Sequence, residues 1–196
     1  VVSDGIAGGK VALNKSGAGI WYLDGANTYS GTTTITAGTL VVNNATALGS
    51  GGNVTLAGGT LQFTPASAAA DYSARLKNTV SGGIKVDTNN ANLIWNNVID
   101  SSNTSGLNKL GNGVLVLNAQ ETYTGVTTLT AGSIQAGTTG ALSTGNITFA
   151  GGVFRATNTI PARVFRQLEQ RRREWPVDYS AEERAATWLN SDRLLL

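Results

Sequence analysis

Six acidic side chains in residues 1–160 are the groups most able to do acid–base or metal chemistry: Asp4, Asp24, Asp71, Asp87, Asp100 and Glu121. Enzymes that cleave polysaccharides use carboxylates in close pairs or clusters, often with calcium and a basic partner. Here each acidic residue stands alone in the sequence, so only folding could bring two of them together. An isolated surface carboxylate is the simpler expectation for each, and we predict no metal site.

Nucleophilic catalysis lacks its usual partners, because the chain contains no His, no Cys and no Met. A Ser or Thr nucleophile therefore has no imidazole base, and neither a thiol nucleophile nor a zinc site can be assembled. The segments Gly17–Gly19 and Gly111–Gly113 differ from phosphate-binding loops, because they lack the third glycine and the lysine precedes them. We therefore expect no catalytic residues and no cofactor.

The charge balance argues against nucleic acid as a partner. Residues 1–160 carry 7 basic and 6 acidic side chains, so they offer phosphates no basic surface. No run reaches the ~20 apolar residues of a membrane-spanning helix, so we expect no direct membrane insertion. The segment after Val1 has no charged leader region, and we expect the chain to be a fragment or a processed piece.

Aromatic side chains offer another route to ligand binding. Tyr29 and Tyr123 could stack on sugars, and Trp21, Tyr22 and Trp95 could form a surface patch. The alternative is that Tyr29 and Tyr123 pack on neighbouring structural units and that the other three lie in the core. The first alternative would make the protein a carbohydrate binder, and the second would make these residues structural.

Many of these residues lie in an internal repeat. Residues 13–38 and 107–132 are identical at 14 of 26 positions without a gap, and the match resumes in residues 53–59 and 146–152. Self-similarity of this length indicates a repeat architecture, with copies at about residues 10–64 and 104–155. The predicted structural corners of the repeat are Tyr29, Gly31, Gly38, Gly58, Gly59, Tyr123, Gly125, Gly132, Gly151 and Gly152.

Short strands between glycine and asparagine corners are the predicted elements of each copy. They include residues 10–13, 19–23, 32–36, 39–42, 54–56 and 61–63. Strands of this length cannot bury an apolar side alone, but parallel stacking on the next coil joins their apolar residues into one shared column. A coil of ~20–25 residues would give roughly seven coils and a rod of ~35 Å. The predicted fold is an all-β parallel β-solenoid.

Two further expectations follow from this stacking. The 94-residue offset between the copies would be about four coils, which places Tyr29 and Tyr123 at equivalent corners along a common axis. The segment from Pro65 to Ala74 interrupts the pattern and is expected to be a loop or a single helical turn. Asn89 and Asn90 suit a corner, because asparagine tolerates the left-handed backbone region.

The repeated pattern resembles a known family. Leu-Asn-Lys-x-Gly-x-Gly, then Thr-Tyr-x-Gly, Thr-Thr-x-Thr-Ala-Gly and Ala-Gly-Gly are similar to the passenger-associated transport repeat, also called the autotransporter-associated β-strand repeat. The resemblance implies a right-handed parallel β-helical passenger, outside or on the surface of a Gram-negative bacterium. It also implies neighbouring repeats and a C-terminal outer-membrane β-barrel, absent from this chain, as partners. In that family the repeat aids transport and is not catalytic.

Residues 161–196 depart from the family pattern. They carry seven Arg and six acidic residues without any Gly, and they predict a short α-helical tail. Arg163 to Trp175 is consistent with one helix, and Ser180–Glu183 is a capping box that begins a second. This segment could be a helical cap on the solenoid, a product of a shifted reading frame, or a basic segment in which Arg171–Arg173 contact an acidic partner.

The sequence thus predicts two domains: a solenoid repeat region in residues 1–160 and an Arg/Glu-rich tail in residues 161–196. The predicted function is a non-enzymatic structural segment of a secreted or surface-displayed autotransporter passenger, which aids export and acts as a rigid stalk. The alternatives are a carbohydrate-binding adhesin segment, with a glycan or host surface as ligand, and a carbohydrate-active β-helix enzyme.

Overall fold

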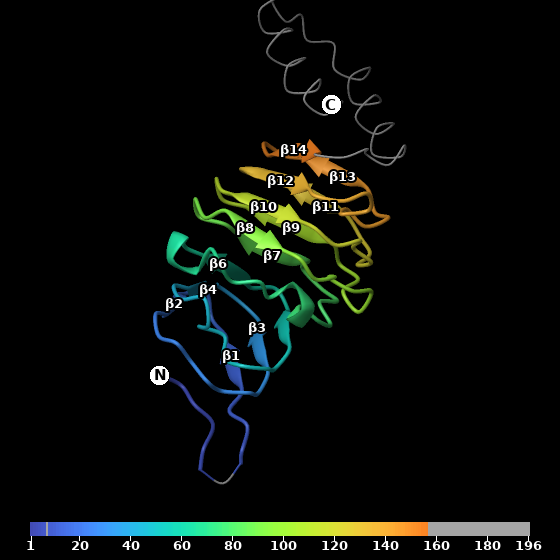
Figure 1. Cartoon of the computed structure of the whole chain (residues 1–196). Helices are drawn as coiled ribbons and strands as arrows, with labels where there is room; N and C mark the ends of the chain where they lie inside the picture. Colours follow the sequence, from blue (N-terminus) through green and yellow to red (C-terminus); the bar gives the residue numbers. More distant parts are fainter. Residues whose placement is uncertain (7, 157–196) are drawn as a thin grey trace, which may run out of the picture.

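The structure is a computed structural model that describes residues 1–6 and 8–156 as one stack of short coils (Figure 1). Every strand pairing in it is parallel and joins strands of successive coils. The strands in chain order are β1 Leu13–Lys15, β2 Ile20–Leu23, β3 Thr33–Ile35, β4 Thr39–Val42, β5 Val54–Leu56, β6 Thr60–Phe63, β7 Ile84–Asp87, β8 Leu93–Trp95, β9 Leu107–Leu110, β10 Val114–Leu117, β11 Thr127–Leu129, β12 Ser133–Ala136, β13 Ile147–Phe149 and β14 Val153–Ala156. The predicted parallel β-solenoid is confirmed.

Three sheets form the sides of the stack. Sheet A contains β1, β3 and β5, sheet B contains β2, β4, β6, β7, β9, β11 and β13, and sheet C contains β8, β10, β12 and β14. Each coil contributes one strand to sheet B, so its seven strands correspond to seven coils and the expected number of coils is also confirmed. The right-handed winding implied by the family resemblance remains a prediction.

The core is a set of apolar columns that run through the stack. In sheet B, Leu40 pairs with Leu61 and Leu61 pairs with Val86, and all three side chains are fully buried. Burying a side chain of this size stabilises the fold by about 1.5–3 kcal/mol. Each coil therefore gains its stability from the coils above and below it, as the short strands require.

The two strands of each coil lie on different faces in the first and the second half of the stack. In the first coils, a strand of sheet A is followed by a strand of sheet B, as in β3 and β4. From β7 onward, a strand of sheet B is followed by a strand of sheet C, as in β11 and β12. The two-strand unit has thus moved by one face around the axis.

Residues 64–83 make this change. They contain two 3₁₀ helices, η1 (Pro65–Ser67) and η2 (Ser73–Arg75), in the segment where the sequence predicted a loop or a helical turn. Leu76 then forms a single parallel bridge to Val54 of sheet A in place of a further strand. The chain next enters sheet B, where Thr60 pairs with Lys85. The coil between these two residues is therefore 25 residues long, whereas the coil from Ile20 to its partner Thr39 is 19 residues long.

The face change corrects one expectation. From β4 to β11 there are four steps along sheet B, but β3 lies one strand before β4 in sheet A. The offset between the copies is therefore four coils plus one face. Tyr29, just before β3, and Tyr123, just before β11, consequently lie along the same stack but at corners of different faces, so the expectation of equivalent corners is wrong.

Two matched corners show why glycine is needed between consecutive strands. Gly38 has φ +66°, and Gly132 has φ +61°, in the left-handed region that L-residues with a side chain rarely adopt. A Cβ on Gly38 would also overlap the carbonyl oxygen of Gly19, and one on Gly132 would overlap that of Gly113. At each corner, the glycine allows the backbone to approach the previous coil closely.

The predicted tail lies outside the described residues, so its helices and the domain division at residue 160 remain predictions. Within residues 1–6 and 8–156, no helix is long and apolar enough to cross a membrane.

Candidate functional site

The two repeated tyrosines are buried. Tyr29 and Tyr123 are both 0% exposed, and their hydroxyls bond to Oγ1 of Thr33 (2.7 Å) and of Thr127 (2.6 Å) respectively. Burial raises the pKa of Tyr123 to about 12, so this hydroxyl stays neutral. Neither ring is available to a sugar, and each locks a corner to the strand that follows it.

The other aromatic residues divide into two groups. Trp95 is fully buried and packs edge-on against Phe63 at a centroid distance of 6.0 Å. Trp21 and Tyr22 lie on β2, the last strand of sheet B among the described residues, and are 45% and 62% exposed. The structure therefore does not bring the three candidate residues together into one surface patch.

The remaining predicted corner glycines lie where another backbone or side chain passes closely. The atoms that a Cβ would meet are the backbone of Val11 for Gly31, of Gly106 for Gly125, of Thr36 for Gly58 and of Thr130 for Gly151, the side chain of Ile35 for Gly59, and the side chain and backbone of Leu129 for Gly152. The contacts of Gly58 match those of Gly151, and those of Gly59 match those of Gly152. These positions are compatible with the corner role that the sequence assigns to them.

Asp4 and Asp71 accept hydrogen bonds both within their own turn and from the following coil. Asp4 accepts hydrogen bonds from Val11 and Ser30, and these bonds lower its pKa. Asp71 accepts from Ser73 and from the backbone of Asn96. No group of three or more acidic residues in the described part of the chain could hold a metal ion.

Two buried lysines are the residues that sequence reasoning missed. Lys15 and Lys109 are matched in the repeat, and both are fully buried although they carry charge. Lys15 Nζ donates to the carbonyl oxygens of Ser16 (3.2 Å), Gly17 (2.7 Å) and Ala37 (3.0 Å). Ala37 belongs to the next coil, so each ammonium group links two coils.

The second lysine repeats this arrangement. Lys109 Nζ donates to the carbonyl oxygens of Leu110 (2.8 Å), Gly111 (2.8 Å) and Ala131 (3.3 Å). Burial lowers the pKa of Lys109 to about 8, and the negative charge of Asp87 opposes this shift. Hydrogen bonds to the three carbonyl oxygens favour the charged form. The signal that could have indicated this burial is the position of Lys109 in its strand, because Lys109 is the register partner of the core residue Leu129.

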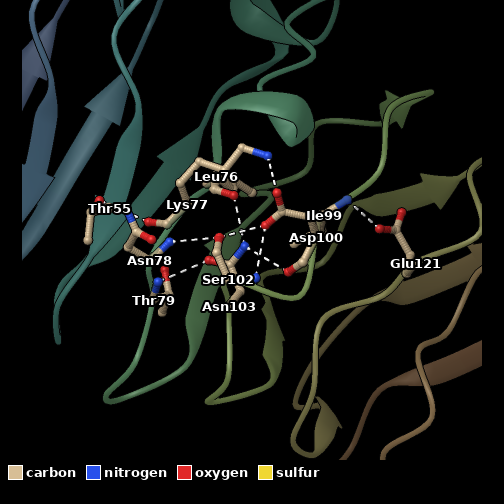
Figure 2. Close-up of polar contacts among 10 residues, drawn as sticks. All are labelled: Thr55, Leu76, Lys77, Asn78, Thr79, Ile99, Asp100, Ser102, Asn103 and Glu121. Atoms are coloured by element: carbon tan, nitrogen blue, oxygen red, sulfur yellow. Dashed lines mark hydrogen bonds and ion pairs between the residues drawn. The ribbon is translucent and has the colours of Figure 1, made fainter.

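A second set of polar links joins the coils near the face change (Figure 2). Asn103 is fully buried, donates from Nδ2 to the Leu76 carbonyl (2.8 Å) and accepts from the Thr79 amide (3.0 Å). Lys77 pairs with Asp100, whose pKa is lowered mainly by this contact and by Ser102. These bonds replace a strand ladder where sheet A has ended.

Glu121, at the right of Figure 2, is the most unusual of the acidic residues. It is 4% exposed, so the expectation of a surface carboxylate is wrong for this residue. Its Oε2 accepts from the Ile99 amide (2.6 Å), and burial raises its pKa to about 8. Its counterpart in the first copy, Asn27, is also buried and polar.

The arrangement defines a class of protein: a parallel β-solenoid in which buried polar side chains connect consecutive coils. The chain carries two copies of the passenger-associated transport repeat, because the model of that family matches residues 13–42 and 107–136. This confirms the resemblance deduced from the sequence. A chain with this repeat is surface-displayed or extracellular in a Gram-negative bacterium, as expected.

A characterised relative agrees with this assignment. The adhesin BmaC autotransporter of Brucella suis biovar 1 (strain 1330) is 35% identical over 146 residues. The match covers 67% of this chain and 4% of that protein, so the chain spans a small part of the relative's length. No solved structure matches the chain significantly.

Proposed function

We propose that the chain is a non-enzymatic stalk segment of an autotransporter passenger. The observation that carries this proposal is the uninterrupted parallel stacking of seven strands in sheet B. Such a stack resists bending and pulling because every coil between the two end coils is bonded to two others. Its partners would be neighbouring repeats and a C-terminal outer-membrane β-barrel in the full-length protein.

The same stacking supports a role in export. A coil gains its stability only when the coil next to it has folded, so folding outside the cell would proceed coil by coil. Each folded coil would make return of the chain through the membrane more costly. Residues such as Lys15, which bonds to Ala37 in the next coil, add polar links to this sequential process.

Deleting residues 13–156 in frame from the full-length protein tests this function. The expected result is reduced arrival of the passenger at the cell surface, measured by antibody labelling of intact cells and by protease accessibility. A control deletion of equal length in another repeat region shows whether the effect depends on stalk length alone. Normal display, together with an unchanged distance of the passenger tip from the cell, would refute the stalk and export roles.

The second candidate is a carbohydrate-binding adhesin segment. The name of the Brucella relative favours it, and the exposed Trp21 and Tyr22 would be the residues to test. A glycan array probed with the 196-residue chain and with a Trp21→Ala variant separates the candidates. Specific binding that the variant loses would support the adhesin role, and absence of binding would favour the stalk role. Release of saccharide from a bound glycan would instead indicate an enzyme.

A further inference from the structure

Asn27 forms a link between three consecutive coils in the first copy. Its Oδ1 accepts from the amide of Val2 (2.7 Å) in the preceding coil. Its Nδ2 donates to the carbonyl oxygen of Ala47 (2.7 Å) in the following coil. An amide side chain carries both a donor and an acceptor at every ordinary pH, so this link does not depend on proton concentration.

The second copy repeats the surrounding backbone. The amides of Thr122 and Tyr123 donate to the Ile99 carbonyl (3.2 and 3.1 Å), as those of Thr28 and Tyr29 donate to the Val2 carbonyl (2.9 and 3.3 Å). Ile99 therefore takes the place of Val2, and its amide donates to Glu121. The repeat alignment puts Ala141 in the place of Ala47.

The hydrogen-bond donor of this link is the part that differs between the two copies. Glu121 Oε1 is buried and has no hydrogen-bond partner among the described residues. An ionised carboxylate only accepts hydrogen bonds, so it cannot replace the Nδ2 of Asn27. A protonated carboxyl group regains a donor, and the alignment with Ala47 indicates the carbonyl of Ala141 as its acceptor.

The surroundings of Glu121 favour the protonated form. Burial raises its pKa most, and the negative charge of Asp71 raises it further, while the bond from Ile99 opposes the change. The Tyr123 hydroxyl nearby stays neutral because its own pKa is raised to about 12. Among the described residues, neither Lys nor Arg forms an ion pair with Glu121.

We propose that Glu121 is a proton-operated link between coils. Protonated, it accepts from Ile99 with one oxygen and donates to the Ala141 carbonyl with the other, as Asn27 does in the first copy. Loss of the proton leaves a buried carboxylate facing a carbonyl oxygen, which weakens the contact between the coils. This link is thus sensitive to pH in the second repeat, and its Asn27 counterpart in the first repeat is not.

The direction of the effect follows from proton linkage. The raised pKa means that the folded state holds a proton that the unfolded state has released at the same pH. Stability is therefore greatest in acid and falls as the pH rises from the unfolded pKa of about 4.3 towards the folded value of about 8. One linked proton changes the unfolding equilibrium constant by about tenfold per pH unit in this range.

Urea unfolding of the 196-residue chain from about pH 5 to about pH 9 tests the proposal. The chain has no histidine, which simplifies this range. Glu121→Gln is the key variant, because its amide supplies a donor and an acceptor at every pH. We expect it to match the wild type near pH 5 and to be at least about tenfold more stable, in the unfolding equilibrium constant, near pH 9. Other titrating groups, including Lys109, cancel in this comparison.

Asn27→Asp supplies the reciprocal variant. It places a carboxyl group in the first copy and should create a new loss of stability at alkaline pH, which a second variant, Asn27→Gln, should not show. Parallel pH profiles for the wild type and Glu121→Gln would overturn the proposal, whatever their absolute stability. Failure of Asn27→Asp to gain pH dependence would also overturn it.

Discussion

Lys15 and Lys109 each hold their ammonium group in a cage of backbone carbonyl oxygens. The two cages are built from matched positions of the repeat but lie on different faces of one solenoid. Lys15 lies on β1 in sheet A, and Lys109 lies on β9 in sheet B. Each contacts the corner after its own strand and the matching corner of the next coil, through Ala37 or Ala131. The repeat thus carries its own internal link, which does not depend on the face it occupies.

Replacing Lys109 by Ala should destabilise the chain by about 3 kcal/mol, because three carbonyl oxygens lose a charged donor and the stem leaves a cavity. The free energy of unfolding in urea measures the effect. Lys10→Ala removes an exposed lysine and should change it by no more than about 0.5 kcal/mol. Equal effects of the two substitutions would show that the cage contributes no stability.

Gly132→Ala should destabilise the chain by about 2 kcal/mol or more. Its φ of +61° strains any L-residue with a side chain, and the new Cβ would overlap the carbonyl oxygen of Gly113. Gly51→Ala is the matched control, because a Cβ there meets no atom within 4 Å. Thermal unfolding followed by circular dichroism should show a lower midpoint for the first variant alone. A tolerated Gly132→Ala would mean that the corner relaxes without cost.

The sequence predicted the elements of the fold better than their arrangement. The strands Thr39–Val42 and Val54–Leu56 were placed correctly, and Asn89 and Asn90 do have positive φ. Local patterns suffice for these features because each depends on a few neighbouring residues. The face on which a strand stacks depends instead on the total length of chain since the previous coil, which residues 64–83 change.

The buried polar side chains were missed for a related reason. Charge in a sequence normally indicates exposure, and Lys109 and Glu121 are exceptions because the backbone supplies their partners. Their spacing contained a usable signal: Lys109 occupies the inward position of its strand, level with Leu129. Glu121 aligns with Asn27, and a match between an amide and a carboxyl group is consistent with a protonated acid.

Asp100 should give the stability of the chain a pH dependence opposite to that from Glu121, and the Asp100→Asn variant should lose it. The pKa of Asp100 is lowered, first by the bond from Lys77 and then by Ser102, so the ionised form of Asp100 stabilises the folded state. This stability is present above the unfolded pKa of about 3.9 and is lost as the pH falls through the lower folded value. Because the side chains of Lys77 and Asp100 are 26% and 37% exposed, solvent screening limits the effect to about 1 kcal/mol at most.

Urea unfolding at about pH 7 and in acid checks this expectation. The variant should be slightly less stable than the wild type near neutrality, and the difference should disappear in acid. Asp24→Asn, at an exposed position, serves as the control. A difference that persists unchanged in acid would mean that Asp100 acts by packing or by its bonds to Ser102, not by its charge.

Trp95→Ala should weaken the junction between the two halves of the solenoid. Trp95 packs against Phe63 of β6, and its Nε1 donates to the Ala70 carbonyl (3.3 Å) in the segment that changes faces. Removing a buried aromatic side chain costs about 3–5 kcal/mol. Hydrogen exchange of individual amides can show where that loss occurs.

The exchange pattern distinguishes a local effect from a global one. If Trp95 couples the halves, the amides of β7 and β8, next to the junction, should lose protection before those of β11 and β12, which lie farther along the stack. This order follows because each coil depends most on its immediate neighbours. Phe154→Ala, which removes a buried aromatic ring at the other end of sheet C, should reverse the order. Uniform loss of protection in both variants would instead show that the described coils unfold as a single cooperative unit.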